Sequence, residues 1–242
     1  MQNHAGDEGS SSTITGNMPV YGRIFNPDLS EFVGAPAISM GYLLLKRTMD
    51  VLLSLLAIPT LLIPELLIAA EIILTSKGPA FYREARIGRN GRTFRIWKFR
   101  SMYSDAYHLG RTDSVEPVAG ALHWRMRKHL RDPRVTAVGS FLRVWSLDEL
   151  PQFLNVLQGE MSLIGPRPIV QGELCLYGDL LDCYLRVKPG MSGLWQVSGR
   201  SNVDYAKRVE LDAEYLRTCS LNTDLSLLFR TIPAVLRCEG SR

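Results

Sequence analysis

Two adjacent carboxylates, Asp148 and Glu149, stand at the predicted start of a helix that continues through Leu157. Ser146, three residues before Glu149, completes a capping-box pattern, which would explain the pair as a helix cap. A helix start also keeps carboxylates ionised and binds phosphate, and aspartate can attack phosphorus in covalent catalysis. The pair is therefore a candidate for phosphoryl chemistry as well as for a structural cap.

Arginines crowd this acidic pair, and a helix cap does not explain their number. Arg167 lies between Pro166 and Pro168, which restrict the backbone and would hold its planar guanidinium in place for phosphate oxygens. A solvated arginine in a turn is the commoner interpretation of a lone Pro-Arg-Pro motif. We expect an anion beside the pair, because further arginines lie near it in the sequence: Arg131, Arg134 and Arg143.

A glycine-rich stretch at residues 187–201 contains Gly190, Gly193 and Arg200. Such a loop can bring backbone N–H groups close to a ligand, and Arg200 would add a phosphate contact. Glycine-rich loops are more often simple turns, so both interpretations stay open.

Two cations share one face of a predicted strand. The strands at residues 79–87 and 93–100 flank an Asn-Gly pair, which is typical of a β-hairpin turn. Alternation along the second strand puts Lys98 and Arg100 on the face of Phe94 and Ile96. This face could meet a phosphate or form a solvated edge of the sheet.

The elements that must position these residues begin with the apolar segment at residues 46–76. It is long enough to span a bilayer core, which takes about 20 apolar residues. Pro59 and Pro64 interrupt it, however, and Glu65 would lie near the middle of the bilayer in a straight helix. We therefore expect a membrane helix that is broken at Ile63 and Pro64.

Basic residues flank both ends of this segment and favour the cytoplasmic face. We expect a re-entrant helical hairpin that enters the membrane and returns to the same side, with protein or headgroup partners for the carbonyls freed at the break. A kinked single span and a buried helix of a soluble protein are the alternatives.

The bulk composition is that of one compact unit behind a polar tail. We expect residues 1–40 to be disordered, residues 41–77 to form the re-entrant membrane helix, and residues 78–242 to form a cytosolic catalytic domain that works as one unit with this helix. The net charge of +4 favours anionic partners without selecting among lipid headgroups, nucleotides and nucleic acid. The four cysteines contain no CxxC pair, so neither a zinc site nor a redox motif is indicated.

Two amphipathic segments, residues 122–131 and 221–237, could lie on a membrane surface. The first is basic and could equally be a solvated helix that touches the core. The second spaces its apolar residues as a helix does, and core packing is the preferred interpretation for it. The patterns together predict an α/β fold, mostly α, with a membrane helix hairpin, a compact cytosolic domain with amphipathic interfacial helices, and a small β-hairpin.

Several motifs follow the proline-containing apolar helix in a consistent order: WKFRSM, DPRVTAVGSFLR, SLDELPQFLNVLQGEMSLIGPRP, KPGMSGLWQVSGRS and ELDAEYLRTCSLNTDL. In combination they resemble the bacterial sugar transferase family over about residues 42–240. The chain is similar to its small members, the monotopic phosphoglycosyl transferases that initiate exopolysaccharide and glycoconjugate assembly. One departure is Ile63, where other members often have serine before the proline of the break.

The resemblance implies transfer of a sugar 1-phosphate from a UDP-sugar to polyprenol (undecaprenyl) phosphate, with release of UMP and a requirement for Mg2+. It further implies a ping-pong mechanism in which Asp148 is the nucleophile and forms a phosphosugar-aspartyl intermediate. Glu149 would assist with the metal or the lipid phosphate, so Asp148 and Glu149 are the implied metal ligands. The implied substrate-binding residues are Lys98, Arg100, Arg143, Arg167 and Arg200.

By the same resemblance we expect a monotopic protein on the cytoplasmic face of the bacterial inner membrane, in contact with phospholipids. The protein could also form a homodimer. Galactose or glucose is the expected sugar. A nucleic-acid partner is not expected, because it would leave the apolar helix unexplained. The alternative function is that of a catalytically silent, membrane-bound assembly or regulatory protein of a polysaccharide pathway.

Overall fold

The computed structural model describes residues 38–104, 132, 134–199 and 203–237. Within them the chain is mostly helical, with two small sheets and one long apolar helix, as the patterns predict. The expected tail up to residue 37, the basic segment at residues 122–131 and Arg200 lie outside the described residues.

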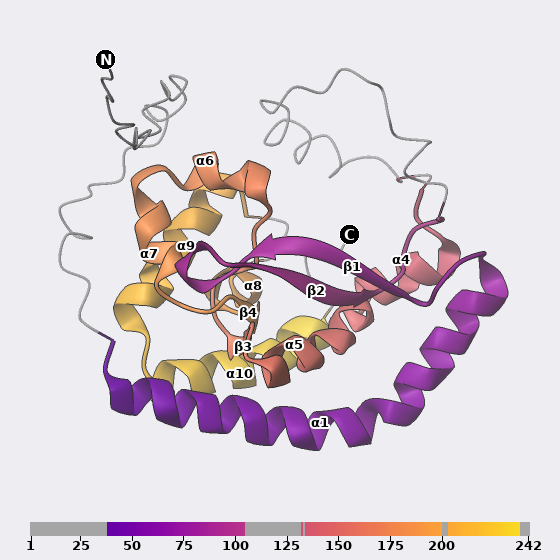
Figure 1. The fold of residues 1–242 in the computed structure, drawn as a ribbon, viewed down its shortest axis with the longest axis horizontal. Coiled ribbons are helices and arrows are strands. Elements are labelled where there is room, and N and C mark those ends of the chain that lie inside the picture. Colours follow the sequence, from indigo (N-terminus) through magenta and orange to yellow (C-terminus); the bar gives the residue numbers. More distant parts are fainter. Residues whose placement is uncertain (1–37, 105–131, 133, 200–202, 238–242) are drawn as a thin grey trace, which may run out of the picture.

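Helix α1 (Met40–Thr75) is the apolar segment, and it continues without interruption through Pro59 and Pro64. The expected break at Ile63 and Pro64 is therefore not an end of the helix, and α1 is not two helices joined by a turn. Figure 1 shows that α1 bends instead. A proline removes one backbone hydrogen bond and displaces the preceding turn while its neighbours stay helical, and the Thr60 hydroxyl donates to carbonyls of that turn.

Both ends of α1 pack on the rest of the chain, and its middle does not. Near the start, Asp50 and Ser54 are buried, and near the end Ile72 is 2% exposed. Of the most apolar 18-residue stretch only 6% is buried. The middle of the helix carries side chains that are at least half exposed, among them Leu62, Ile63, Leu66 and Leu67.

The predicted β-hairpin is present. Strands β1 (Phe81–Ile87) and β2 (Thr93–Phe99) pair antiparallel, so that Tyr82 lies opposite Lys98. The turn η3 (Arg89–Gly91) gives Asn90 and Gly91 positive φ angles of 58° and 72°, which explains the Asn-Gly pair there. On β2, Phe94 and Ile96 face the largest core cluster of the described residues.

After the hairpin come three short helices in a row: α4 (Ala137–Val144), η4 (Leu147–Gln152) and α5 (Phe153–Gln158). A second, parallel sheet pairs β3 (Ser162–Ile164) with β4 (Gly190–Ser192). The crossover between these strands holds η5 (Gln171–Glu173), α6 (Leu174–Tyr177), η6 (Gly178–Leu180) and α7 (Leu181–Leu185). The chain then forms α8 (Leu194–Val197), α9 (Tyr205–Thr218) and α10 (Leu221–Leu236).

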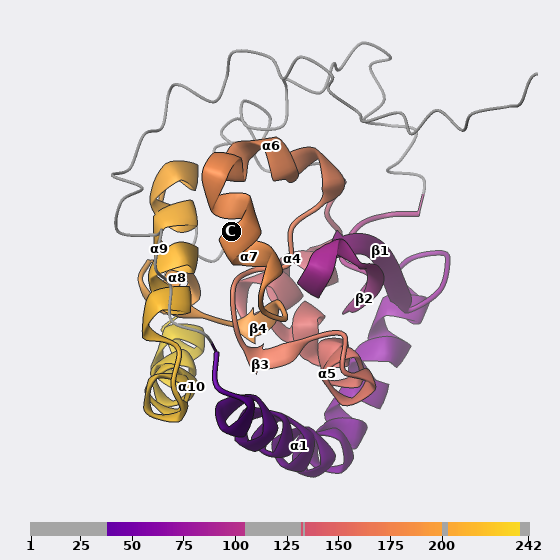
Figure 2. The same cartoon turned by 60° about the vertical axis from the view of Figure 1, so that its left-hand side comes forward.

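Helix α10 has one face that packs on the core and one apolar face that is exposed, so each of the two interpretations of its pattern, core packing and an exposed amphipathic surface, describes one face. Asp224 and Leu227 are buried, so this face packs on the core. The opposite face is apolar but exposed, which makes core packing the wrong expectation for Leu225, Ile232 and Leu236. The buried Asp224 carboxylate explains how α10 is oriented. It accepts hydrogen bonds from Tyr42, Lys46 and Tyr215, which keep the Asp224 side of the helix toward the core. Figure 2 shows α10 at the same lower edge of the molecule as α1.

Candidate active site

Asp148 and Glu149 lie in the first turn of η4, a 3-10 helix that follows α4 after a tight turn. Ser146 forms that turn in a left-handed conformation with φ of 55°, and its side chain makes no cap hydrogen bond. The expected capping box is therefore wrong, because the αL backbone at Ser146 does not direct its hydroxyl to the first turn. The two carboxylates need another explanation.

The turn with the carboxylates is held between the hairpin and the C-terminal end of α1. Leu147 and Leu150 pack on a core cluster that includes Ile72 of α1 and Phe99 of β2. One turn later the buried Asn155 side chain accepts from the Trp97 N–H and donates to the Arg95 carbonyl, both on β2. The acidic pair is thus fixed at the contact between β2 and the C-terminal end of α1.

Lys98 of β2 forms an ion pair with Glu149, with 2.8 Å between Lys98 Nζ and Glu149 Oε1. Burial acts to raise the pKa of Glu149, but the charges of Lys98 and Arg167 outweigh it, and the pKa lies below its ordinary value. Glu149 is therefore ionised, and Lys98, an expected substrate-binding residue, lies beside it.

Asp148 is 9% exposed, and burial raises its pKa to about 6. The nearby charges of Lys98 and Arg143 act in the opposite direction, and the Glu149 carboxylate adds to the rise. Arg143 is held by a 2.9 Å hydrogen bond from its Nε to Ser101 Oγ. At neutral pH Asp148 is thus an ionised, poorly solvated carboxylate between two cations, an arrangement that suits a nucleophile.

Arg167 follows β3 on the Pro-Arg-Pro loop, close enough to lower the pKa of Glu149. Its backbone carbonyl accepts from the Tyr184 hydroxyl at 3.1 Å. Its guanidinium lies over the Trp195 ring, 5.4 Å from the centroid, and Arg208 lies over the same ring at the same distance. Stacking of this kind restrains a guanidinium without occupying its hydrogen-bond donors.

Two glycines pack against the Pro-Arg-Pro loop. A Cβ at Gly190 would lie 2.2 Å from the Gly165 nitrogen, and a Cβ at Gly193 would lie 2.1 Å from the Gly165 carbonyl oxygen. The Gly190 N–H donates to the Pro166 carbonyl at 2.8 Å. Gly190 and Gly193 therefore serve close packing of two backbones, which places Arg167.

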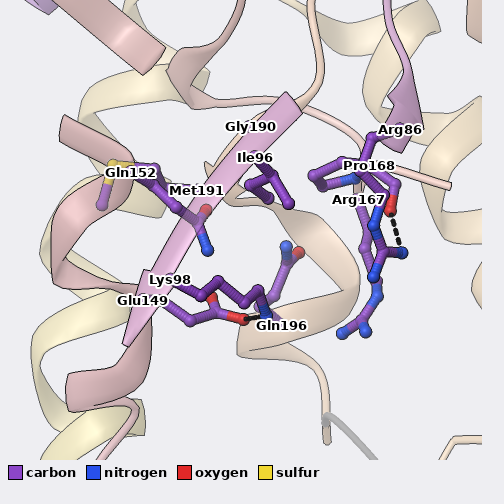
Figure 3. A pocket seen from close by; sticks show the side chains of 10 residues that line it. All are labelled: Arg86, Ile96, Lys98, Glu149, Gln152, Arg167, Pro168, Gly190, Met191 and Gln196. Carbon is purple, nitrogen blue, oxygen red and sulfur yellow. Dashed lines mark hydrogen bonds and ion pairs between the residues drawn. The ribbon is translucent and has the colours of Figure 1, made fainter. Parts of the chain in front are cut away.

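These elements line an open pocket with about 330 Å³ of empty space, the adjoining solvent included, and Figure 3 shows its side chains. The sequence prediction missed three polar residues of this pocket: Arg86, Gln152 and Gln196. The spacing offered one signal, since Gln152 lies four residues after Asp148 and so about one helical turn away. The lining residues are Arg86, Ile96, Lys98, Glu149, Gln152, Arg167, Pro168, Gly190, Met191 and Gln196.

Arg100 is not part of this pocket. Its guanidinium donates to the carbonyls of Ile72 and Ser76, at 3.2 and 2.8 Å, and to the carbonyl of Lys77. It therefore satisfies the last turn of α1, and its expected role in substrate binding is replaced by a structural one. The reason is that Arg100 follows the last residue of β2, where the chain passes the end of α1.

Among the described residues no group of three or more His, Cys, Asp or Glu side chains is arranged to hold a metal ion. Mg2+ usually needs fewer protein ligands, because it is bound by one or two carboxylates together with substrate phosphates and water. Asp148 and Glu149 supply two adjacent carboxylates, of which Glu149 lines the basic pocket. This donor set fits an Mg2+ ion that binds together with a phosphorylated substrate.

Comparison with known proteins gives consistent matches. The family model described as bacterial sugar transferase matches residues 41–238. The chain is 46% identical over 197 residues to the exopolysaccharide production protein ExoY of Sinorhizobium fredii, covering 81% of this chain and 87% of that protein. It is also 46% identical over 198 residues to the undecaprenyl-phosphate galactose phosphotransferase of Salmonella typhimurium, covering 81% of this chain and 41% of that protein.

A third relative is the UDP-glucose:undecaprenyl-phosphate glucose-1-phosphate transferase of Escherichia coli, which is 41% identical over 199 residues. The match covers 78% of this chain and 39% of that protein. The chain thus spans most of ExoY and about two fifths of the two longer relatives.

Proposed function

The chain belongs to the bacterial sugar transferase family, and from this premise we propose that it transfers a sugar 1-phosphate from a UDP-sugar to undecaprenyl phosphate and releases UMP. The observation that carries the proposal is the buried, ionisable Asp148, held between Lys98 and Arg143 at the end of the apolar helix. The names of two relatives include galactose and glucose, and we propose one of these as the sugar.

In the first step an Asp148 carboxylate oxygen would attack the phosphorus that bears the sugar. The bond from this phosphorus to the oxygen of UMP would break, and UMP would leave with the electron pair of that bond. Arg167 and Lys98 are suited to bind the phosphates, because fixed cations stabilise the charge that phosphoryl transfer spreads over oxygens. The product on the protein would be a phosphosugar-aspartyl intermediate.

In the second step an oxygen of undecaprenyl phosphate would attack the same phosphorus. The bond to Asp148 would break, which regenerates the carboxylate and gives undecaprenyl-diphospho-sugar. Glu149 is suited to position the incoming phosphate or the metal, because its ion pair with Lys98 keeps it ionised beside Asp148. Asp148 and Glu149 would hold Mg2+, which when bound would neutralise phosphate charge.

The shape of α1 supports a re-entrant insertion from the cytoplasmic face of the bacterial inner membrane. Both ends of the helix pack on the same domain, while the apolar middle is exposed. A straight helix of 36 residues would be about 54 Å long. The bend in Figure 1 supports an arrangement in which the middle enters the membrane and both ends remain at its surface.

The two steps can be tested separately with purified protein in detergent. With Mg2+ and no lipid acceptor, labelled UMP should exchange into UDP-galactose or UDP-glucose, because the first step is reversible. With undecaprenyl phosphate added, UMP should be released. Asp148→Asn should abolish both reactions. Exchange that persists in Asp148→Asn would remove Asp148 as the nucleophile, and release without exchange would exclude the ping-pong order.

A further inference from the structure

The pocket beside Glu149 contains two glutamine side chains that the transfer steps do not use. Gln152 is 1% exposed, and its Nε2 has no hydrogen-bond partner among the described residues. Gln196 Oε1 is also buried and without a partner in this part of the chain. Figure 3 shows both carboxamides at the middle of the pocket, on the same side of the Lys98–Glu149 ion pair as Ile96.

Unpartnered polar groups in a buried position disfavour folding, because they lose water without gaining another hydrogen-bond partner. A ligand that donates to Gln196 and accepts from Gln152 would satisfy both. A ligand that pairs with both groups must therefore carry a hydrogen-bond donor and a hydrogen-bond acceptor close together. The diphosphate of a nucleotide sugar does not meet this demand, because its ionised oxygens can only accept hydrogen bonds.

The surroundings narrow the class of ligand. Ile96, Met191 and Pro168 give the pocket apolar surface, which suits the faces of a flat ring, while Arg167 and Lys98 supply positive charge for an attached phosphate. Asp148 does not line this pocket, so the sugar on the attacked phosphorus is expected elsewhere. Of the parts of a nucleotide sugar, the base is then the one that can occupy this pocket and pair with the two glutamines.

We propose that Gln152 and Gln196 read the edge of a uracil base, with Gln196 Oε1 accepting from uracil N3–H and Gln152 Nε2 donating to a neighbouring carbonyl oxygen. The inference deepens the proposed function, since it takes a UDP-sugar as the substrate of this site. It assigns the pocket as the base subsite and the two glutamines as the residues that determine the choice of nucleotide.

A comparison of ligands on the unaltered chain tests the proposal without any variant. Calorimetric titration in detergent with Mg2+ would measure binding of UMP, of N3-methyl-UMP and of ribose 5-phosphate. The methyl group removes the N3–H donor, so N3-methyl-UMP should bind at least about fivefold more weakly than UMP, as expected for loss of a paired hydrogen-bond contact to a base. Equal affinities for UMP and N3-methyl-UMP would overturn the proposal.

Variants then connect the effect to the two residues. Gln152→Met and Gln196→Met keep the length of the side chain and remove its hydrogen bonds, so UMP affinity should fall to that of ribose 5-phosphate. Inorganic pyrophosphate should bind as before, which also reports that the variant is folded. Gln171→Met, at an exposed glutamine outside the pocket, should change nothing. Unchanged UMP affinity, or an equal loss for UMP and pyrophosphate, would contradict the proposal.

The result is separable from that of the transfer assay. Selective binding of UMP without release of UMP from UDP-sugars would reject the proposed reaction and keep the uracil subsite. Turnover of UDP-sugars with equal binding of UMP and N3-methyl-UMP would reject the uracil subsite alone.

Discussion

At the scale of single residues, Asp148 lies where a carboxylate is unfavourable. It is buried beside a second carboxylate, and the charges of Lys98 and Arg143 only partly compensate, so that its pKa rises to about 6. Perturbed carboxylates of this kind cluster at functional sites, because the same burial that disfavours the charge makes it reactive. The consequence is a conflict between stability and activity at this position.

Asp148→Asn should therefore stabilise the protein. The folded state holds the Asp148 proton more tightly than the unfolded state, so the unfavourable contribution of the carboxylate is complete above pH 6 and disappears as the pH falls toward 4. The gap between an ordinary aspartate and a pKa of about 6 corresponds to at most roughly 3 kcal/mol. Chemical denaturation should show a gain of roughly 1 to 3 kcal/mol at pH 8 that vanishes near pH 4.

Glu214→Gln is a matched control, since Glu214 is exposed on α9. It should leave the free energy of unfolding nearly unchanged at both pH values. A loss of stability in Asp148→Asn at pH 8 would show that the carboxylate has a favourable partner in the folded state.

The exchange of UMP should depend on pH through the same residue. Because the attacking group in the proposed reaction is the carboxylate, kcat/KM should fall as the pH is lowered through about 6, the pKa of Asp148. Lys98 lowers this pKa by its charge, so Lys98→Met should move the midpoint to higher pH. A midpoint that stays in place or moves to lower pH would mean that another group controls the profile.

At the scale of elements, α1 is joined to the domain by polar contacts at both ends. Lys46 Nζ lies 2.8 Å from Asp224 Oδ2, and Asp50 accepts from the Leu163 N–H at 3.0 Å. At the other end Arg100 donates to carbonyls of the last turn. Because such contacts have defined geometry, they fix the position of a helix whose apolar surface alone would let it slide or rotate.

Arg100→Leu should accordingly destabilise the protein while leaving substrate binding intact. Removing a buried guanidinium leaves carbonyls of α1 without donors, so the free energy of unfolding should fall by roughly 2 to 4 kcal/mol. Arg92→Leu, at an exposed arginine of the hairpin turn, should have little effect. A raised KM for the UDP-sugar with unchanged stability would restore Arg100 to the substrate site.

The course of α1 through the membrane can be tested by labelling its two ends. Met40→Cys and Lys77→Cys place single thiols at exposed positions in a chain whose own cysteines are replaced by serine. In oriented vesicles a membrane-impermeant maleimide should label both positions from the same side. Labelling from opposite sides would make α1 a single span and remove the re-entrant proposal.

At the scale of the whole molecule, the exposed apolar side chains gather away from the pocket. Most of them lie on α1 and on the outer face of α10, although Phe81, Phe141 and Trp145 are exposed elsewhere. Figures 1 and 2 place both helices along the lower edge. The hairpin and the acidic pair lie on the inner side of α1. A domain that rests on a membrane through these two helices would keep its pocket open to soluble nucleotide.

Charges on the outer face of α10 should therefore impair only the step that uses the lipid. Phe229 and Ile232 are 68% and 57% exposed, so Phe229→Glu combined with Ile232→Glu should preserve folding and UMP exchange. Transfer to undecaprenyl phosphate in vesicles should fall about tenfold or more, since each apolar side chain that leaves the membrane loses about 1.5 to 3 kcal/mol. Ser226→Glu, on the polar side of the helix, is the control. Equal loss of both reactions would contradict this role.

The sequence by itself determined the features that depend on neighbours in the chain. The apolar composition of α1 and the Asn-Gly hairpin turn follow from local patterns, and the order of motifs indicated the family. The acidic pair and the proline-held Arg167 were recognisable because their chemistry depends on residue type and short spacing. Composition, turn sequences and short spacings of this kind can be recognised without knowing how the segments pack in the fold.

Only the tertiary structure decided which partner each polar group meets. Arg100 satisfies the end of α1, Gly190 and Gly193 meet the backbone at Gly165, and Gln152 and Gln196 line one pocket, although no local pattern connects these residues. The physical reason is that burial removes water, so a polar group must take whatever partner the fold brings near, from any distance along the chain. The carboxylate pair, for which a solvated helix cap is the simplest explanation in the sequence, is in the fold a buried aspartate beside a glutamate that is ion-paired with Lys98.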